Sequence, residues 1–194
     1  MNHPKIFAPA VTLSLHDFTM LGAPVVQQTR TVAELAEYFL ESSEVSKISA
    51  DQLVYKVQTW LPVKEGTAGG LFFGVSTVMP GKVGREYFMT KGHFHAQSDR
   101  GEFYWGVQGQ GFLILMNRQR QTWAEQVFPG SLHYIPGETA HRLANVGDEA
   151  LIVGACWPAD AGYNYHEITQ NGFSARLLDL EGRPRLIDMK DSHS

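Results

Sequence analysis

The sequence predicts a mainly β protein in which short antiparallel strands form a barrel or a sandwich. From residue 103 onward, strand-like apolar segments follow one another at short intervals, and Gly, Asn, Asp or Pro separates most of them. The 194-residue chain contains 19 Gly and 9 Pro, which indicates many turns. Crossover helices between these segments are missing, so parallel βαβ units are not expected.

The expected strands can be placed in order along the chain. An irregular arm over residues 1–30 includes one short strand within residues 11–15, and a helical turn is expected within 160–173. Two longer strands are expected at 53–60 and 71–79. The others are expected at 103–107, 112–116, 122–128, 132–135, 141–146, 150–156, 175–180 and 185–189.

One short amphipathic helix is expected from Thr31. Glu34 follows three residues later, as in a capping box. Apolar residues recur at helical spacing, namely Val32, Leu35, Ala36, Phe39 and Leu40. Residues 42–50 are expected to form a connector. The expected organisation is one domain over residues 1–194: an N-terminal arm and helix (1–50), a barrel core (about 51–157) and a C-terminal extension (158–194).

Composition and charge exclude several classes of partner. The formal net charge of -4 argues against nucleic-acid binding, which usually requires an excess of basic residues. No run approaches the roughly 18 apolar residues needed to span a bilayer, and the N-terminus lacks the features of a signal peptide. The single cysteine, Cys156, cannot form an internal disulfide. A cytoplasmic location without membrane association is therefore expected.

The segment from Thr90 to Glu102 contains candidate metal ligands. His93 and His95 are two residues apart, so on an extended strand their imidazoles leave the same face. Glu102 opens the next apolar run, and His141 offers a fourth ligand. A single histidine of this kind is more often a hydrogen-bonded core or surface residue. Together, however, the set suits iron, manganese, nickel, zinc or copper better than magnesium or calcium.

The two blocks around these residues resemble the paired motifs of the cupin superfamily. The second block consists of Gly130, Pro136, His141 and Asn145. In cupins the first block supplies two histidines and a glutamate, and the second supplies the last histidine. This chain has a longer gap than usual between His95 and Glu102, and Glu138 stands where glycine is usual. The resemblance implies a cupin fold, an antiparallel β-barrel or jelly roll, with a short N-terminal helix and extra N- and C-terminal strands.

A more specific resemblance covers about residues 70 to 170. Residues 79–95 resemble the corresponding run of cupin-type glucose-6-phosphate isomerases, the metal-dependent family typified by archaeal enzymes. Further matches are 102–104, 140–142, 145–149 and 158–162. The resemblance implies an aldose-ketose isomerase of glycolysis and gluconeogenesis that interconverts glucose 6-phosphate and fructose 6-phosphate. It also implies that the protein is a homodimer and that its small-molecule ligand is a hexose phosphate.

The same resemblance implies a role for individual residues. The implied ligands of one divalent transition metal per subunit are His93, His95, Glu102 and His141. Fe(II) is favoured, with Ni, Mn and Zn as alternatives. The implied phosphate-binding residues are Ser76, Thr90, Gly92 through its backbone, and Tyr165. Glu102 would also relay a proton between C1 and C2 of a metal-stabilised enediolate, with a direct hydride shift as the competing route. Tyr104 would lie beside the metal and the substrate hydroxyls.

Two positions depart from the family pattern. Trp157 replaces a tyrosine, and Tyr163 replaces a histidine, for which the nearby His166 is a possible substitute. A phenol with a pKa near 10 is a weaker acid-base group at neutral pH than an imidazole. Lys91 and Arg142 are expected to be solvated or bridging charges.

Two other functions remain compatible with the sequence. A ferrous cupin dioxygenase would use the same ligands, because the ligands alone do not select the reaction. A non-catalytic cupin that binds metal and sugar phosphate is the second alternative, and the departures at Trp157 and Tyr163 leave it open. Oxygen consumption would identify the first of these, and hexose phosphate binding without turnover would identify the second.

Overall fold

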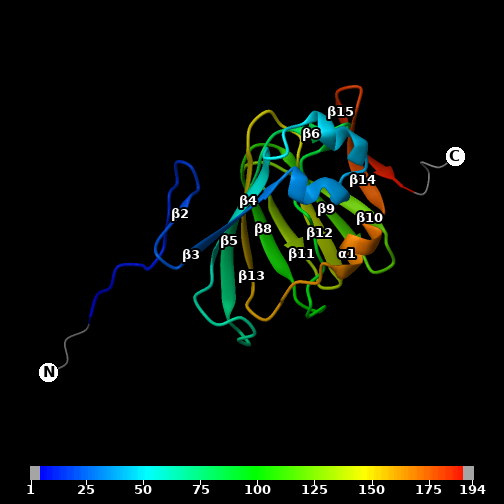
Figure 1. Cartoon of the computed structure of the whole chain (residues 1–194). Helices are drawn as coiled ribbons and strands as arrows, with labels where there is room; N and C mark the ends of the chain where they lie inside the picture. Colours follow the sequence, from blue (N-terminus) through cyan, green and yellow to red (C-terminus); the bar gives the residue numbers. More distant parts are fainter. Residues whose placement is uncertain (1–4, 190–194) are drawn as a thin grey trace.

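The computed structural model of the chain describes residues 5–189 and contains two antiparallel sheets that face each other as walls of a barrel (Figure 1). The larger sheet has the strand order β11-β8-β13-β5-β4-β3, and the smaller has the order β10-β9-β12. The larger consists of β3 (Val25–Thr31), β4 (Leu53–Trp60), β5 (Leu71–Val78), β8 (Glu102–Gln108), β11 (Leu132–Ile135) and β13 (Leu151–Pro158). The smaller consists of β9 (Gly111–Asn117), β10 (Thr122–Val127) and β12 (Thr139–Asn145). This arrangement confirms the predicted mainly β, antiparallel fold.

Further short elements lie outside the two main sheets. A hairpin is formed by β1 (Thr12–Leu13) and β2 (Met20–Leu21). A four-stranded sheet has the order β15 (Arg183–Asp188), β14 (Ala175–Leu180), β7 (Glu86–Tyr87) and β6 (Lys82–Val83). These elements supply the predicted N- and C-terminal strands. The helix α1 (His166–Asn171) lies where a helical turn was expected. No helix within residues 5–189 is long and apolar enough to cross a membrane.

The strand predictions from residue 53 onward agree closely with the structure. The bounds of β4, β11 and β14 are those predicted, and the other predicted strands differ by one or two residues at one or both ends. The two-residue strands β6 and β7 were not predicted. The ends of the predicted strands could be recognised in the sequence because the turns between them use residues that tolerate unusual backbone angles. Gly109, between β8 and β9, has a φ of 77°, a left-handed conformation that glycine adopts without a side-chain clash.

The prediction of an irregular N-terminal arm with one short strand is wrong from residue 20 onward. This segment contains β2 and the seven-residue β3, which pairs with β4 at an edge of the larger sheet. Most residues of β3 are exposed, and an exposed edge strand needs no apolar alternation. Its sequence therefore gave little strand signal. Residues 1–4 of the predicted arm lie outside the described residues.

The predicted single helix is replaced by two short 3-10 helices, η1 (Ala33–Tyr38) and η2 (Ser42–Lys47), the second within the predicted connector. Part of the capping prediction holds, because the Glu34 carboxylate accepts a hydrogen bond from the Thr31 amide at 2.8 Å. Phe39 is extended and ends the first helix. The amide of Leu40 then donates to the buried Glu86 carboxylate at 2.7 Å. This tertiary contact overrides the helical periodicity of the sequence.

The core fills the space between the two sheets. Leu113 and Leu115 of β9 and Leu143 of β12 are at most 1% exposed, and they belong to one cluster with Val153 of β13. Each fully buried side chain of this size contributes about 1.5–3 kcal/mol to folding. This packing fixes the register of the strands, and the register sets the positions of the residues described next.

Candidate metal centre

Two candidate ligands, His93 and His141, lie opposite each other on neighbouring backbone segments. The His93 amide donates to the His141 carbonyl at 3.4 Å, and the His141 amide donates to the His93 carbonyl at 3.1 Å. Their ring centroids are 4.6 Å apart, and the ring of His95 is 5.4 Å from that of His141. The segment around His93 is extended, as the spacing of His93 and His95 suggested, but it pairs with its neighbours through isolated bridges only.

Glu102 joins the cluster from the first position of β8. Its Oε2 lies 3.2 Å from Nε2 of His95 and 3.2 Å from Nε2 of His141. Across His93, His95, Glu102 and His141, one potential ligand atom per residue lies within 4.8 Å of all the others. Ligand atoms that share one ion at about 2.0–2.2 Å have a similar spacing. The structure thus brings together the four side chains that the sequence singled out.

Backbone carbonyls orient two of the imidazoles. Nδ1 of His95 is 2.8 Å from the Arg100 carbonyl, and Nδ1 of His141 is 3.4 Å from the Thr139 carbonyl. A carbonyl can only accept, so each Nδ1 carries a hydrogen, and the Nε2 of each ring faces Glu102. The buried Nε2 of His93 has no hydrogen-bond partner among residues 5–189, and that of His141 lies 3.2 Å from the Glu102 carboxylate without forming a regular hydrogen bond. Buried polar atoms are seldom left unpaired, and a cation would satisfy both.

The environment of His93 and Glu102 favours the protonation states that metal binding requires. Burial, with smaller effects from His141 and His95, lowers the pKa of His93 well below its ordinary value. Burial opposes ionisation of Glu102, but the imidazoles of His141 and His95 outweigh it and leave the pKa of Glu102 below its ordinary value. A neutral imidazole and an ionised carboxylate are both metal ligands. The donor set therefore fits a divalent transition metal.

The long gap between His95 and Glu102 forms a loop that is fastened to the chain after β13. The Gln97 amide donates to the Ala161 carbonyl at 2.9 Å. Arg100 forms a two-point contact with Asp160, with Nε to Oδ1 at 3.0 Å and Nη2 to Oδ2 at 2.8 Å. Because the Arg100 carbonyl orients His95, this ion pair helps to position a candidate ligand. It also gives a physical role to Asp160, which the sequence only marked as part of a motif.

Glu138 adopts the backbone conformation for which glycine is usual. Its φ of 59° is left-handed, a region that costs roughly 1–2 kcal/mol for a residue with a side chain. Arg118 donates from Nε to the Glu138 carboxylate at 2.7 Å, and the Glu138 amide donates to the Ser98 carbonyl. These contacts offset the backbone cost and hold the turn that precedes β12 and His141.

A cavity of about 410 Å³ opens beside the histidines, within the range usual for small-molecule sites. Its wall includes three of the candidate ligands, namely His93, Glu102 and His141. It also includes every other site residue expected from the sequence: Ser76, Thr90, Gly92, Tyr104 and Tyr165. Trp157 and Tyr163, the two positions that depart from the family pattern, line it as well. His166 is exposed and is not among the lining residues, so it does not replace the missing imidazole.

The segment with Thr90 and Gly92 presents hydrogen-bond donors to the cavity. The Thr90 hydroxyl accepts a hydrogen bond from the Leu143 amide at 3.0 Å, which leaves its own hydrogen free to donate. Gly92 has a φ of 77°, and a Cβ there would lie 2.8 Å from the Phe173 ring and 3.0 Å from the His141 carbonyl. Only glycine fits this position.

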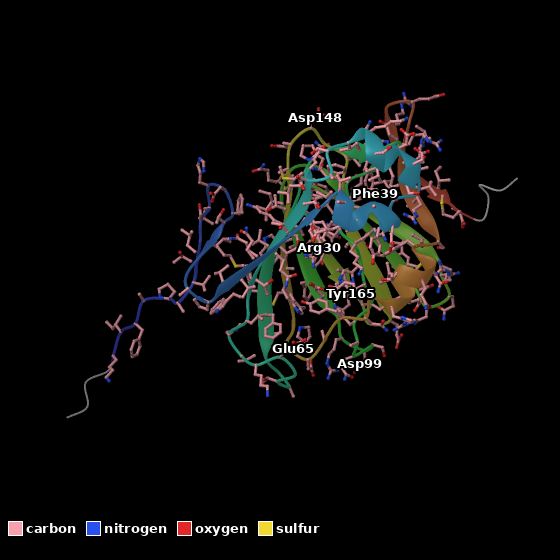
Figure 2. All side chains as sticks on the ribbon, in the orientation of Figure 1. Arg30, Phe39, Glu65, Asp99, Asp148 and Tyr165 are labelled. Carbon is pink, nitrogen blue, oxygen red and sulfur yellow. The ribbon has the colours of Figure 1, made fainter. Side chains whose placement is uncertain are left out.

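Several cavity residues were not predicted from the sequence. Gln28 and Arg30 of β3 and Tyr55 and Thr59 of β4 line the wall, and Figure 2 shows Arg30 and Tyr165 over the same part of the barrel. Gln28 and Arg30 are two residues apart, so they leave the same face of a strand. That spacing could have linked the two side chains, but only after β3 had been recognised as a strand.

The expectation that Lys91 and Arg142 are solvated or bridging charges needs correction. Arg142 is only 2% exposed, lies 4.0 Å from the ring of Phe173, and donates from Nη2 to the Lys91 carbonyl at 3.1 Å. Lys91 is half-buried and lines the cavity, with Nζ 4.6 Å from the Tyr165 ring and 4.8 Å from the Tyr38 ring. Arg142 therefore holds the segment that carries Lys91 and Gly92.

The antiparallel barrel and its cluster of three histidines and one glutamate define a cupin with a candidate metal centre. The family model for glucose-6-phosphate isomerase (GPI) matches residues 29–189. A glucose-6-phosphate isomerase of Thermococcus kodakarensis is 37% identical over 160 residues, 82% of this chain and 84% of that protein. One of Pyrococcus furiosus is 35% identical over 164 residues, 84% of this chain and 86% of that protein. The chain belongs to the glucose-6-phosphate isomerase family.

This membership confirms the resemblance drawn from the motifs, and with it the expectation of an isomerase. The family match begins in β3, a region where the motifs showed no similarity. Among solved structures, oxalate decarboxylase from Bacillus subtilis is similar with a TM-score of 0.45 and 20% identity. That similarity covers 56% of this chain and 26% of the decarboxylase chain.

We expect His95→Ala to lose metal. The substitution removes one of four candidate ligands and leaves the Arg100 carbonyl without its partner. Loss of outer contacts alone costs metal sites about 10- to 100-fold in affinity, so loss of a ligand is expected to cost more than about 100-fold. Metal per subunit after dialysis measures this, with the exposed His16→Ala as control. Full metal retention by the folded His95→Ala variant would remove His95 from the ligand set.

Proposed function

We propose that this chain is a metal-dependent isomerase that interconverts glucose 6-phosphate and fructose 6-phosphate. One observation carries the proposal: a single cavity is lined by three of the four candidate metal ligands and by all four residues expected to bind phosphate. The two halves of a sugar phosphate need these two environments, one for the carbonyl end and one for the anion. Family membership supports the same substrate class.

The residues proposed to hold the metal are His93, His95, Glu102 and His141. When bound, the ion would supply Lewis-acid polarisation of the sugar oxygens at C1 and C2. Imidazole nitrogens with one carboxylate suit Fe(II), which we favour, and also Ni, Mn and Zn. The unpartnered Nε2 atoms of His93 and His141 support this use of the site.

Glu102 and Tyr104 are the proposed catalytic residues. Glu102 is ionised and buried in the cavity wall, so it can take a proton from C2 and return it to C1 through an enediolate. Burial, with the charge of Glu102 adding to it, raises the pKa of Tyr104 well above its ordinary value. Its phenol therefore stays protonated and can donate a hydrogen bond to a sugar oxygen. A hydride shift would leave Glu102 without this role.

Ser76, Thr90, Gly92 and Tyr165 are proposed to bind the phosphate. Thr90 has a free hydroxyl hydrogen, because its oxygen already accepts from the Leu143 amide. The Gly92 amide makes no hydrogen bond within residues 5–189, and its left-handed backbone is held by the neighbouring chain. Burial raises the pKa of Tyr165 above its ordinary value, which keeps its phenol a donor.

A direct assay tests the proposal. The metal-loaded protein is incubated with glucose 6-phosphate, anaerobically and in air, and fructose 6-phosphate is measured. Equal turnover under both conditions is expected, since the proposed reaction consumes no oxygen. Oxygen consumption with a small carbon substrate would instead indicate a dioxygenase. Binding of hexose phosphate by calorimetry without turnover, across all added metals, would indicate a binding protein.

Tyr163→His is expected to raise isomerase activity or leave it unchanged. The Tyr163 ring lies 4.9 Å from that of His93, against the candidate cluster. Although 47% of the residue is exposed, partial burial and the nearby Tyr165 raise the pKa of its phenol, so it cannot exchange protons near neutral pH. An imidazole at this position can. Values of kcat across pH 6–8 measure the effect, with Tyr163→Phe as the matched control. A large loss of kcat in Tyr163→His alone would contradict this expectation.

We further propose that the chain works as a homodimer in the cytoplasm. The support is the set of exposed apolar side chains at the N-terminal side, where Ile6 is 99%, Phe7 80% and Leu15 80% exposed. The hairpin of β1 and β2 projects from the barrel on this side (Figure 1). Such apolar surface is typical of a segment that another chain covers.

A further inference from the structure

We propose that Arg30 and Lys91 form a cationic clamp for the substrate's phosphate, in addition to the hydroxyl and amide donors. The inference rests on the proposed function and adds two specificity-determining residues to it. Among the residues that line the cavity, Arg30 and Lys91 are the two with permanently cationic side chains. They come from different parts of the fold, the edge strand β3 and the segment before His93, and meet at one cavity.

Strand register places Arg30 at the end of the cavity away from the metal cluster. One row across the larger sheet contains Tyr104, Ala155, Gly74 and Thr59. The next row contains Ser76, Val57 and Gln28, and the one after it contains Tyr55 and Arg30. Successive rows are about 7 Å apart, two residues along a strand. A sugar with its carbonyl end beside Tyr104 therefore extends its phosphate toward Ser76 and Arg30.

A β-bulge separates Arg30 from the next residue of its strand. The register of β3 against β4 shifts between Arg30 and Thr31, so that Arg30 is opposite Tyr55 while Thr31 is opposite Leu53. Bulges redirect side chains and are frequent beside functional sites. Tyr55 is the cross-strand partner of Arg30, and it lines the same cavity as Arg30 and Lys91.

Neither cation is neutralised by a carboxylate within the described part of the chain. Arg30 donates from Nη1 only to the carbonyl of its neighbour Thr29, at 2.7 Å. Lys91 rests over the rings of Tyr38 and Tyr165, which position an ammonium without cancelling its charge. By contrast, ion pairs with Asp or Glu are formed by Lys47, Lys82, Arg85, Arg100, Arg118 and Arg176. Two unpaired cations in one cavity favour a dianionic ligand.

The clamp gives a physical basis for discrimination between phosphorylated and free sugars. In a protein with a net charge of -4, a few hydroxyls would attract a phosphate only weakly from solution. Arg30 can contact two phosphate oxygens at once, whereas Lys91 acts as a point charge. The proposed donors Ser76, Thr90 and Gly92 would orient the group, and the two cations would supply most of its charge stabilisation.

The test measures binding and catalysis in Arg30→Gln, Lys91→Gln and the double variant. The probe is glucitol 6-phosphate, which has no carbonyl group to isomerise, and its phosphate-free counterpart is glucitol. Each single substitution is expected to weaken glucitol 6-phosphate binding and to raise the KM for glucose 6-phosphate about tenfold or more, with metal content unchanged. Arg30→Lys is expected to recover part of the loss. Rising salt should weaken binding by the wild type more than by the double variant.

Lys56→Gln is the matched control. Lys56 lies on β4 between Tyr55 and Val57, so its side chain leaves the opposite face of the strand, and it does not line the cavity. The Lys56→Gln variant loses the same charge as Lys91→Gln, and it is expected to bind glucitol 6-phosphate like the wild type. Wild-type affinity in Arg30→Gln and Lys91→Gln, or an equal loss in Lys56→Gln, would overturn the clamp while the proposed isomerase stands. If the wild type neither isomerises nor binds hexose phosphate, the proposed function itself fails.

Discussion

Removal of metal is expected to lower isomerase activity at least about a thousandfold. A bound cation contributes several kcal/mol by stabilising charge on a reacting oxygen, and each 1.4 kcal/mol corresponds to about a tenfold change in rate. The measurement is fructose 6-phosphate formation after chelation and buffer exchange, then after addition of Fe(II), Ni, Mn or Zn separately.

Reloading provides the control for this experiment. Recovery of activity with one or more ions shows that chelation did not damage the fold, and the order of recovery ranks the metals. Circular dichroism of the demetallated protein separates loss of metal from unfolding. Strong activity in protein from which all metal has been removed, as measured by mass spectrometry, would exclude the proposed mechanism.

Glu102→Gln is expected to reduce kcat by about 10²- to 10⁴-fold, the usual contribution of a positioned acid-base group. Glutamine keeps the size of the side chain and one oxygen that can still ligate a metal, but it cannot take up a proton. The variant should therefore bind glucitol 6-phosphate normally. Metal content is measured alongside kcat, because Glu102 is also a candidate ligand and a loss of metal would lower kcat for a different reason.

Glu125→Gln is a matched control for this substitution. Glu125 also accepts a hydrogen bond from a histidine, His133, at 2.7 Å, but it does not line the cavity. Its replacement should leave kcat near the wild-type value. In heavy water, proton relay by Glu102 should introduce solvent deuterium at C1 of fructose 6-phosphate formed from glucose 6-phosphate, and at C2 of glucose 6-phosphate formed in the reverse direction. Product that forms with no deuterium, or near-normal kcat in a metal-loaded Glu102→Gln, would argue against the relay.

The apolar pattern of the sequence was sufficient to predict most strands of the barrel, but it did not predict the edge strand near the N-terminus. The strands β4, β11 and β14 have the predicted bounds, because turn residues interrupt the chain on either side of them. β3 was missed because most of its side chains are exposed. The prediction of a single helix was wrong because the Leu40 amide, which would have continued the helix, donates to the Glu86 carboxylate 46 residues away.

The candidate ligands could be proposed from sequence because they lie in two short motifs. The structure shows that the same four side chains converge within 4.8 Å. No motif predicts which residues contact the loop that carries these ligands. The pair of Arg100 and Asp160 spans 60 residues, and only folding brings the two together.

The sequence by itself determined the chemistry of this protein: a β-barrel, three imidazoles with one carboxylate, and the motifs of the glucose-6-phosphate isomerase family. Spacing along the chain is enough for these, because strand faces and short motifs are local properties. The tertiary structure alone decided which side chains share the cavity, above all that Arg30 lies in it. That placement depends on the pairing of β3 with β4 and on a bulge in their register, which are set by packing between distant segments.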